Sequence, residues 1–109
     1  MMKTTIHSYE VPAIIIESKG FHILDVNEAL LAVYGYSRDE LISRPVFILV
    51  SDHKQAESIR TAEQYKGDDM FMGVSEHHTK SGKKITVKVL ARKTRYKGLP
   101  AYMVILNPA

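Results

Sequence analysis

The chain has 109 residues, of which 45% are apolar and 25% charged, so we expect one ordered domain with a single core. It contains no cysteine, which excludes disulfides, thiolate metal sites and cysteine nucleophiles. No apolar stretch approaches the roughly 20 residues that a membrane-spanning helix needs, and the N-terminus does not resemble a secretory signal. We therefore expect a cytoplasmic domain with no membrane contact.

The net charge of +3 is distributed unevenly along the chain. Residues 80–97 include eight basic side chains and no acidic one, namely Lys80, Lys83, Lys84, Lys88, Arg92, Lys93, Arg95 and Lys97. This block has two interpretations. It could be a solvated strand face on which lysines oppose aggregation, or the footprint of a nucleic acid or another anionic partner.

The first third of the chain predicts a hairpin and a helix. Residues 13–16 are apolar and mostly β-branched, which is typical of a strand, here ending near Ser18. A Lys-Gly pair then predicts a turn, and residues 21–26 a second strand. Asn27 is placed to cap a helix that should end at Gly35. We expect residues 1–12 to flank a domain that covers residues 13–107.

Two further helices are predicted. Ser37 and Glu40 have the spacing of a capping box, so a short helix should begin at Ser37 and end before Pro45. A third helix is expected over residues 53–66, with Asp52 as its cap.

The last third predicts a three-stranded meander. The sequence predicts three strands here, over residues 71–79, 84–96 and 99–106. The connecting turns contain Gly82 and Gly98. Apolar and polar residues alternate in the middle strand, which indicates one buried and one wetter face. The order of two strands, several short helices and three strands predicts an α+β domain with the helices on one face of an antiparallel sheet.

Three segments in this order resemble the PAS family. Residues 23–29 (Ile-Leu-Asp-Val-Asn-Glu-Ala) are similar to the family's strand-into-helix segment. Residues 34–41 (Tyr-Gly-Tyr-Ser-Arg-Asp-Glu-Leu) resemble its "GYS-x-x-EL" stretch, and residues 80–83 (Lys-Ser-Gly-Lys) its "KDG" turn. The resemblance implies a five-stranded antiparallel sheet with short helices on one face. It also implies a sensory or protein-interaction module, not itself an enzyme, within a histidine kinase, cyclic-dinucleotide enzyme, transcription regulator or similar protein.

The resemblance further implies a small apolar pocket between the inner sheet face and the helices. Its lining would be Ile16, Tyr34, Ile48, Ile59, Met72, Val87, Val89, Met103 and Ile105. Methionines suit such a site because an unbranched thioether side chain can repack around different ligands. The alternative is that these side chains simply fill the core and no ligand binds.

We expect no cofactor and no metal. Light-sensing members of the family use a cysteine, which this chain lacks, and residues 70–72 (Met-Phe-Met) stand where flavin-binding members tend to have tryptophan. Haem is the open alternative, because haem-binding members use a histidine on the long helix and His53 begins that helix here. His77 and His78 are neighbours in a strand and should point to opposite faces, so they do not form a metal site.

An enzyme remains a third hypothesis, although none of the common catalytic motifs is present. Homodimerisation is the more specific expectation, because both faces of the last strand are apolar. We predict an interface on the outer face, formed by Leu90, Tyr102, Val104 and Leu106. The alternative is a monomer in which the N-terminal segment, with Ile6, Tyr9 and Val11, covers that face.

Overall fold

The computed structural model describes residues 6–50 and 70–109, except for the side chains of residues 70–72. Its elements are η1 (Ile6–Ser8), β1 (Ala13–Glu17), β2 (Ile23–Val26), α1 (Glu28–Tyr34), α2 (Arg38–Leu41), η2 (Val46–Leu49), β3 (Met70–His78), β4 (Lys84–Tyr96) and β5 (Leu99–Pro108). The helix predicted over residues 53–66 lies outside the described residues. No helix in the described ranges is long and apolar enough to cross a membrane.

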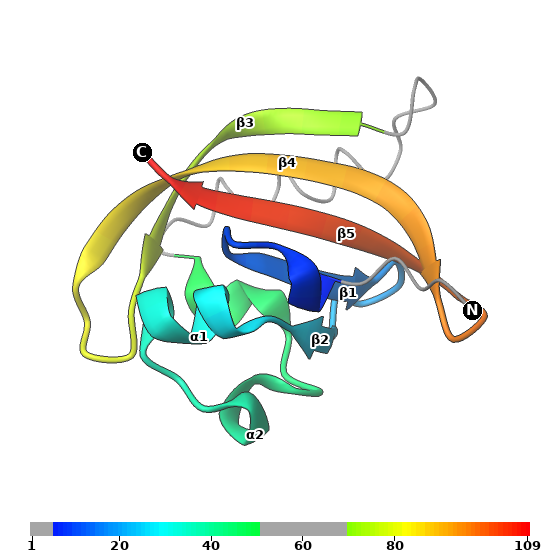
Figure 1. Ribbon diagram of the computed structural model, residues 1–109, viewed down its shortest axis with the longest axis horizontal. Coiled ribbons are helices and arrows are strands. Elements are labelled where there is room, and N and C mark those ends of the chain that lie inside the picture. The colour runs from blue at the N-terminus through cyan, green and yellow to red at the C-terminus, as the bar shows by residue number, and fades with distance from the viewer. Residues whose placement is uncertain (1–5, 51–69) are drawn as a thin grey trace.

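The five strands form one antiparallel sheet with the order β2-β1-β5-β4-β3. The first and last strands of the chain are therefore neighbours in the centre of the sheet. Figure 1 shows α1 and α2 together on one side of the sheet. The predicted α+β architecture is thus the one observed, and we call the side that faces α1 the inner face.

The register between β1 and β5 decides which side chains face inward. Ile14 pairs with Val104 and Ile16 with Tyr102, and these residues belong to the inner cluster. The inner cluster comprises Ile14, Ile16, Phe21, Ile23, Val26, Leu30, Tyr34, Leu41, Val46, Leu49, Val87, Tyr102, Val104 and Leu106. The alternate residues of β1 and β5 face outward, where a smaller cluster contains Ile6, Ala13, Ile15 and Ala101.

This register corrects the predicted interface. Tyr102, Val104 and Leu106 are buried on the inner face and cannot form an outer interface. Conversely, Met103 and Ile105, which were expected in the inner pocket, pack against the outer cluster. The error has a physical cause. Both faces of β5 are apolar because η1 inserts Ile6 over the outer face, and a strand buried on both sides has no alternation from which to orient it.

The turn between β1 and β2 is longer than predicted. β2 begins at Ile23 rather than at residue 21, and both Gly20 and Phe21 have positive φ angles, 79° and 58°. Phe21 nevertheless reaches the core, where its ring meets that of Phe47 edge-on, with 5.7 Å between centroids. In the sequence, an apolar residue at this position resembles the start of a strand, although Phe21 reaches the core from the turn.

Asn27 joins the N-terminal segment to the domain. Its Oδ1 caps α1 by accepting a hydrogen bond from the Leu30 amide and accepts a second from the Ala13 amide, each at 3.0 Å. Its Nδ2 donates to the carbonyl oxygens of Ile6 and Val11, each at 2.9 Å. The side chain is 1% exposed, so one buried amide satisfies four backbone groups.

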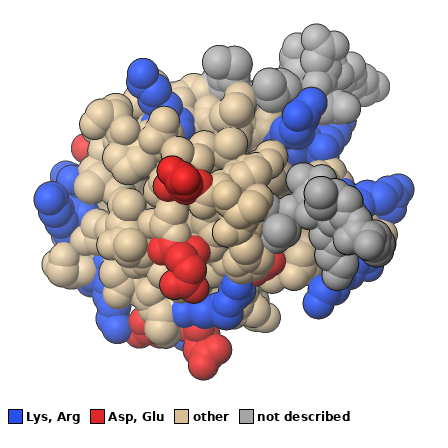
Figure 2. Space-filling model, in the orientation of Figure 1, with Lys and Arg blue, Asp and Glu red and all other residues tan. Residues whose placement is uncertain are grey.

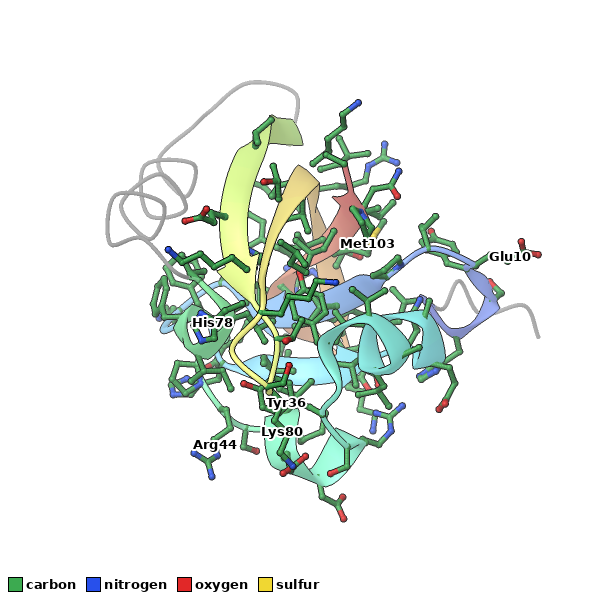
Figure 3. All side chains as sticks on the ribbon, turned by 90° about the vertical axis from the view of Figure 1, so that its left-hand side faces the viewer. Glu10, Tyr36, Arg44, His78, Lys80 and Met103 are labelled. Atoms are coloured by element: carbon green, nitrogen blue, oxygen red, sulfur yellow. The ribbon has the colours of Figure 1, made fainter. Side chains whose placement is uncertain are left out.

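The capping box at the start of α2 also anchors the β3–β4 turn. Glu40 Oε1 accepts from the Ser37 amide at 2.8 Å, as the sequence predicts. Its other oxygen pairs with Lys80 Nζ at 2.6 Å. Figure 3 shows the labelled Lys80 at this junction, and Gly82 supplies the positive φ of 92° that closes the turn.

Candidate functional site

A buried polar pair crosses the inner face. The hydroxyl of Tyr34, at the end of α1, lies 2.7 Å from Nδ1 of His77 in β3. Both side chains are buried, and their ring centroids are 5.9 Å apart. The pair therefore connects the helical layer to β3, an edge strand of the sheet.

Ser75 adds a third polar group to the same face. It lies two residues from His77 in β3, and side chains at that spacing share a face about 7 Å apart. The register confirms this placement, because Ser75 pairs with Val87 of the inner cluster and His77 with Ile85, which packs against it. The Ser75 hydroxyl is buried and has no hydrogen-bond partner among the described residues. We call Tyr34, Ser75 and His77 the inner polar group.

The inner polar group is uncharged near neutral pH. Burial, with repulsion from neighbouring His78, lowers the pKa of His77 from 6.5 to about 4. Burial raises the pKa of Tyr34 well above its ordinary value. Three neutral groups that can donate and accept hydrogen bonds could therefore orient a small ligand against an otherwise apolar face.

The structure places the nine predicted pocket residues in three groups. Ile16, Tyr34 and Val87 lie in the inner cluster, and Ile48 and Val89 pack against it. Met103 and Ile105 lie on the outer face, as corrected above. Ile59 and the side chain of Met72 are outside the described residues. Five of the nine residues predicted for the pocket thus lie on the inner side, and the prediction did not include Ser75 or His77.

A hollow of about 520 Å³ opens beside Tyr34, between the end of α1 and the β3–β4 turn. It is lined by Val33, Tyr34, Gly35, Thr79, Lys80, Ser81 and Lys83. Among the described residues of this lining, Tyr34 is the only one that was predicted for the pocket. Because its hydroxyl also contacts His77, the hollow and the inner polar group share one side chain.

A second polar cluster forms around Asp25 on the outer side. Arg38 Nη1 donates to Asp25 Oδ1 at 2.6 Å and Nη2 to the Val26 carbonyl at 3.0 Å. His7 Nε2 and the Tyr96 hydroxyl lie 3.0 and 3.3 Å from Asp25 Oδ2. Burial raises the pKa of Asp25, but hydrogen bonds from Arg38 and His7 outweigh that effect and hold it below its ordinary value.

The Asp25 cluster joins η1, β2, α2 and the end of β4, and sequence reasoning did not find it. An acidic residue inside the short apolar strand Ile23–Val26 was the available signal, because a buried carboxylate requires partners. In the described part of the chain, no group of three or more His, Cys, Asp or Glu side chains could hold a metal ion. His53, the haem candidate, is outside that part.

A family model and solved structures both relate this chain to PAS domains. A family model described as PAS domain matches residues 11–107. No curated protein sequence matches the chain.

Solved structures with a similar fold share little sequence with it. The PAS domain of an HTR-like protein from Haloarcula marismortui superposes with a TM-score of 0.80 at 18% identity, covering 94% of this chain and 84% of that one. A PAS domain from Colwellia psychrerythraea gives 0.79 at 17%, covering 94% and 89%. One from Desulfitobacterium hafniense gives 0.78 at 24%, covering 98% and 100%.

Proposed function

This chain belongs to the PAS family, whose members are sensory modules of signalling proteins, and from this premise we propose that it binds a small ligand at the inner polar group. The parent protein would be a histidine kinase, a cyclic-dinucleotide enzyme or a transcription regulator. In each case the occupied domain would pass its state to an effector domain of that protein.

The observation that carries the proposal is the Ser75 hydroxyl. It is 6% exposed and lacks a partner among the described residues, and leaving a buried polar group unpaired costs about 1–3 kcal/mol. Tyr34 and His77 do not need a ligand, since they satisfy each other. A ligand that hydrogen-bonds to Ser75 would remove the cost.

The surroundings restrict the chemistry of that ligand. The inner cluster is apolar and the inner polar group is neutral, so a charged ligand would lose its hydration without gaining a counter-charge there. The site therefore suits a small, mainly apolar molecule with one neutral hydrogen-bonding group, such as an alcohol, an amide or an indole. The competing account is a filled core with no ligand.

Native mass spectrometry of freshly purified protein tests the proposal directly, because a retained metabolite adds its mass to the polypeptide. Where none is retained, titration with indole, followed by the amide NMR signals of β3 and α1, provides a defined probe. We expect Ser75→Ala to weaken binding by about tenfold, which corresponds to the loss of one buried hydrogen bond.

Thr86→Val is the matched control, because Thr86 is exposed and pairs with Glu76, which alternates with Ser75 and His77 and so places the removed hydroxyl on the outer face. It should leave indole binding unchanged. An unliganded native mass, together with no β3 response to indole at millimolar concentration, would support the filled core instead.

A homodimer is the second candidate function, and its outer-face interface would use other residues than the sequence predicts. The outer face presents Leu90 next to Ile105 in the register, with Met103 nearby, and Val74 of β3 is 59% exposed. Ile6 covers the adjoining Ala13 and Ile15, in the outer cluster against which Met103 and Ile105 also pack. Exposed apolar side chains that adjoin such a patch favour a second copy as the covering partner.

Light scattering over a concentration series measures this association. Val74→Glu should shift the mass towards that of the monomer, whereas Leu99→Glu should not, because Leu99, 50% exposed, lies at the far end of the sheet beside the β4–β5 turn. A monomeric mass for the wild type up to high micromolar concentration would exclude the dimer.

A further inference from the structure

The basic block of residues 80–97 does not form one continuous surface. β4 has 13 residues, and a strand rises about 3.3 Å per residue, so its ends are roughly 40 Å apart along the strand. Figure 1 shows β4 crossing the molecule from the β3–β4 turn to the β4–β5 hairpin, and Figure 2 shows Lys and Arg side chains at both of these ends. The fold thus separates the basic residues at the two ends of the block, and Lys88 and Arg92 lie between them on the outer face of β4.

The two groups differ in their partners. At the β3–β4 turn, Lys80 is paired with Glu40 at 2.6 Å. At the other end, Arg95 donates to the neutral carbonyl of Gly98 at 3.0 Å. Among the described residues, no ion pair joins Arg95 or Lys19 to an acidic side chain.

Lys19 comes from a distant part of the sequence, and the fold brings it to this second group. A hollow of about 350 Å³ lies between the β1–β2 turn and the β4–β5 hairpin. Its cationic lining residues are Lys19, Lys93 and Arg95, and its apolar lining includes Pro100, Ala101 and Tyr102. None of the lining residues that the structure describes is acidic. We call this hollow the basic cup.

We propose that the basic cup docks a short acidic segment of a protein partner. Carboxylates of the segment would pair with Lys19 and Arg95, and an apolar side chain between them would rest on Pro100 and Tyr102. A cluster of one sign attracts a segment of the opposite sign, and charge complementarity of this kind sets partner choice and encounter rate.

The dimensions favour a peptide over a nucleic acid. A duplex carries one phosphate charge per about 1.7 Å of its axis, and proteins that bind it typically contact several phosphates along a continuous basic surface. Here the three cations surround one small hollow with an apolar lining, and the neighbouring basic residues of β4, Arg92 and Lys88, lie on the opposite face of the strand. Such a cup fits one or two side chains of an extended peptide.

The test uses two fluorescein-labelled 12-residue peptides. One alternates Asp and Glu around a central Leu, and the other replaces each acid with Asn or Gln. We expect the acidic peptide alone to raise fluorescence anisotropy, with an affinity that falls steeply as salt increases. Equal binding of the neutral peptide, or no binding of the acidic one at low salt, would overturn the proposal.

Matched variants locate the binding. Lys19→Glu/Arg95→Glu should weaken binding of the acidic peptide by more than about tenfold, as expected when charge pairs become repulsive. Lys83→Glu/Lys84→Glu makes the same change in net charge at the other end of β4 and should alter affinity by less than about threefold, because exposed charges that far apart are screened. Equal losses in the two variants would indicate non-specific attraction and contradict a docking site.

Two further measurements complete the experiment. Lys19→Gln/Arg95→Gln repeats the test without introducing negative charge, and the unfolding midpoint of each variant should match the wild type because these side chains are exposed. A labelled duplex oligonucleotide is measured in parallel. If the duplex binds more tightly than the acidic peptide, and the Lys19/Arg95 variants weaken that binding, the ligand of the basic cup is a nucleic acid and the proposal is overturned. The ligand of the inner polar group enters none of these measurements, so this proposal stands independently of the proposed function.

Discussion

The Tyr34 hydroxyl and His77 Nδ1 are 2.7 Å apart in the buried layer between α1 and β3, although 43 residues separate them in the chain. A hydrogen bond inside an apolar core leaves both partners dependent on each other, because no water can replace either one.

Removing one partner should therefore destabilise the domain. We expect Tyr34→Phe to lower the free energy of unfolding by about 1–3 kcal/mol, since it leaves a ring nitrogen of His77 unpaired. Urea denaturation followed by circular dichroism measures the change. Tyr36→Phe is the control, because Tyr36 lies outside the fully buried core. Equal midpoints for Tyr34→Phe and the wild type would contradict this role.

His77 also predicts a loss of stability in mild acid. Burial lowers its pKa from the ordinary 6.5 to about 4 in the folded domain, so between these two pH values the unfolded chain binds a proton that the folded domain does not. Stability therefore falls as the pH decreases through this window, by about 2 kcal/mol between roughly pH 7 and pH 5.

The comparison of wild type with His77→Gln isolates this contribution from the other histidines. The variant should lose less stability than the wild type over the same pH range. Asp25 does not contribute to the change in stability over this pH range. Its folded pKa is lowered, so the stability that it contributes is present above about pH 4 and is lost only at lower pH. Parallel pH profiles for the two proteins would show that His77 is protonated in the folded state.

Replacing Asn27 should destabilise the domain strongly. Asn27→Ala removes four hydrogen bonds at a buried site, and we expect the free energy of unfolding to fall by roughly 3 kcal/mol or more. Hydrogen exchange should also show faster exchange of the Ala13 amide, which loses its acceptor. Slow exchange at Ala13 in this variant would mean that another group holds the N-terminal segment.

Ser37 is the milder counterpart. It begins α2 in an exposed capping box, so Ser37→Ala should lower the free energy of unfolding by about 1 kcal/mol with no change in the slope of the denaturation curve. An unchanged midpoint would show that the Ser37 side chain does not stabilise the start of the helix.

We further expect the purified protein to be colourless. The chain lacks the cysteine of light-sensing relatives, and residues 70–72 replace the tryptophan typical of flavin-binding ones. An absorption spectrum of freshly purified protein is the measurement. A Soret band that disappears in His53→Ala would instead support haem binding.

Local sequence determined the features that depend on a few adjacent residues. Asn27, Gly35 and the Ser37–Glu40 pair mark helix ends because capping involves only the groups of one turn. Likewise, the turns at Gly82 and Gly98 set the meander of β3, β4 and β5, since positive φ angles there favour glycine. These short-range signals were enough to predict the order of β1, β2, α1, α2, β3, β4 and β5 and the α+β class.

Only the tertiary structure decided which residues meet. The two faces of β5 are equally apolar, and its orientation depends on the β1 register and on the contact that Ile6 makes with the outer face. The inner polar group combines α1 with β3, and the basic cup brings Lys19 to Arg95 across more than two-thirds of the chain. Such contacts arise from strand pairing between distant segments, and no local pattern records them, because a side chain's own neighbours in sequence do not determine what lies opposite to it.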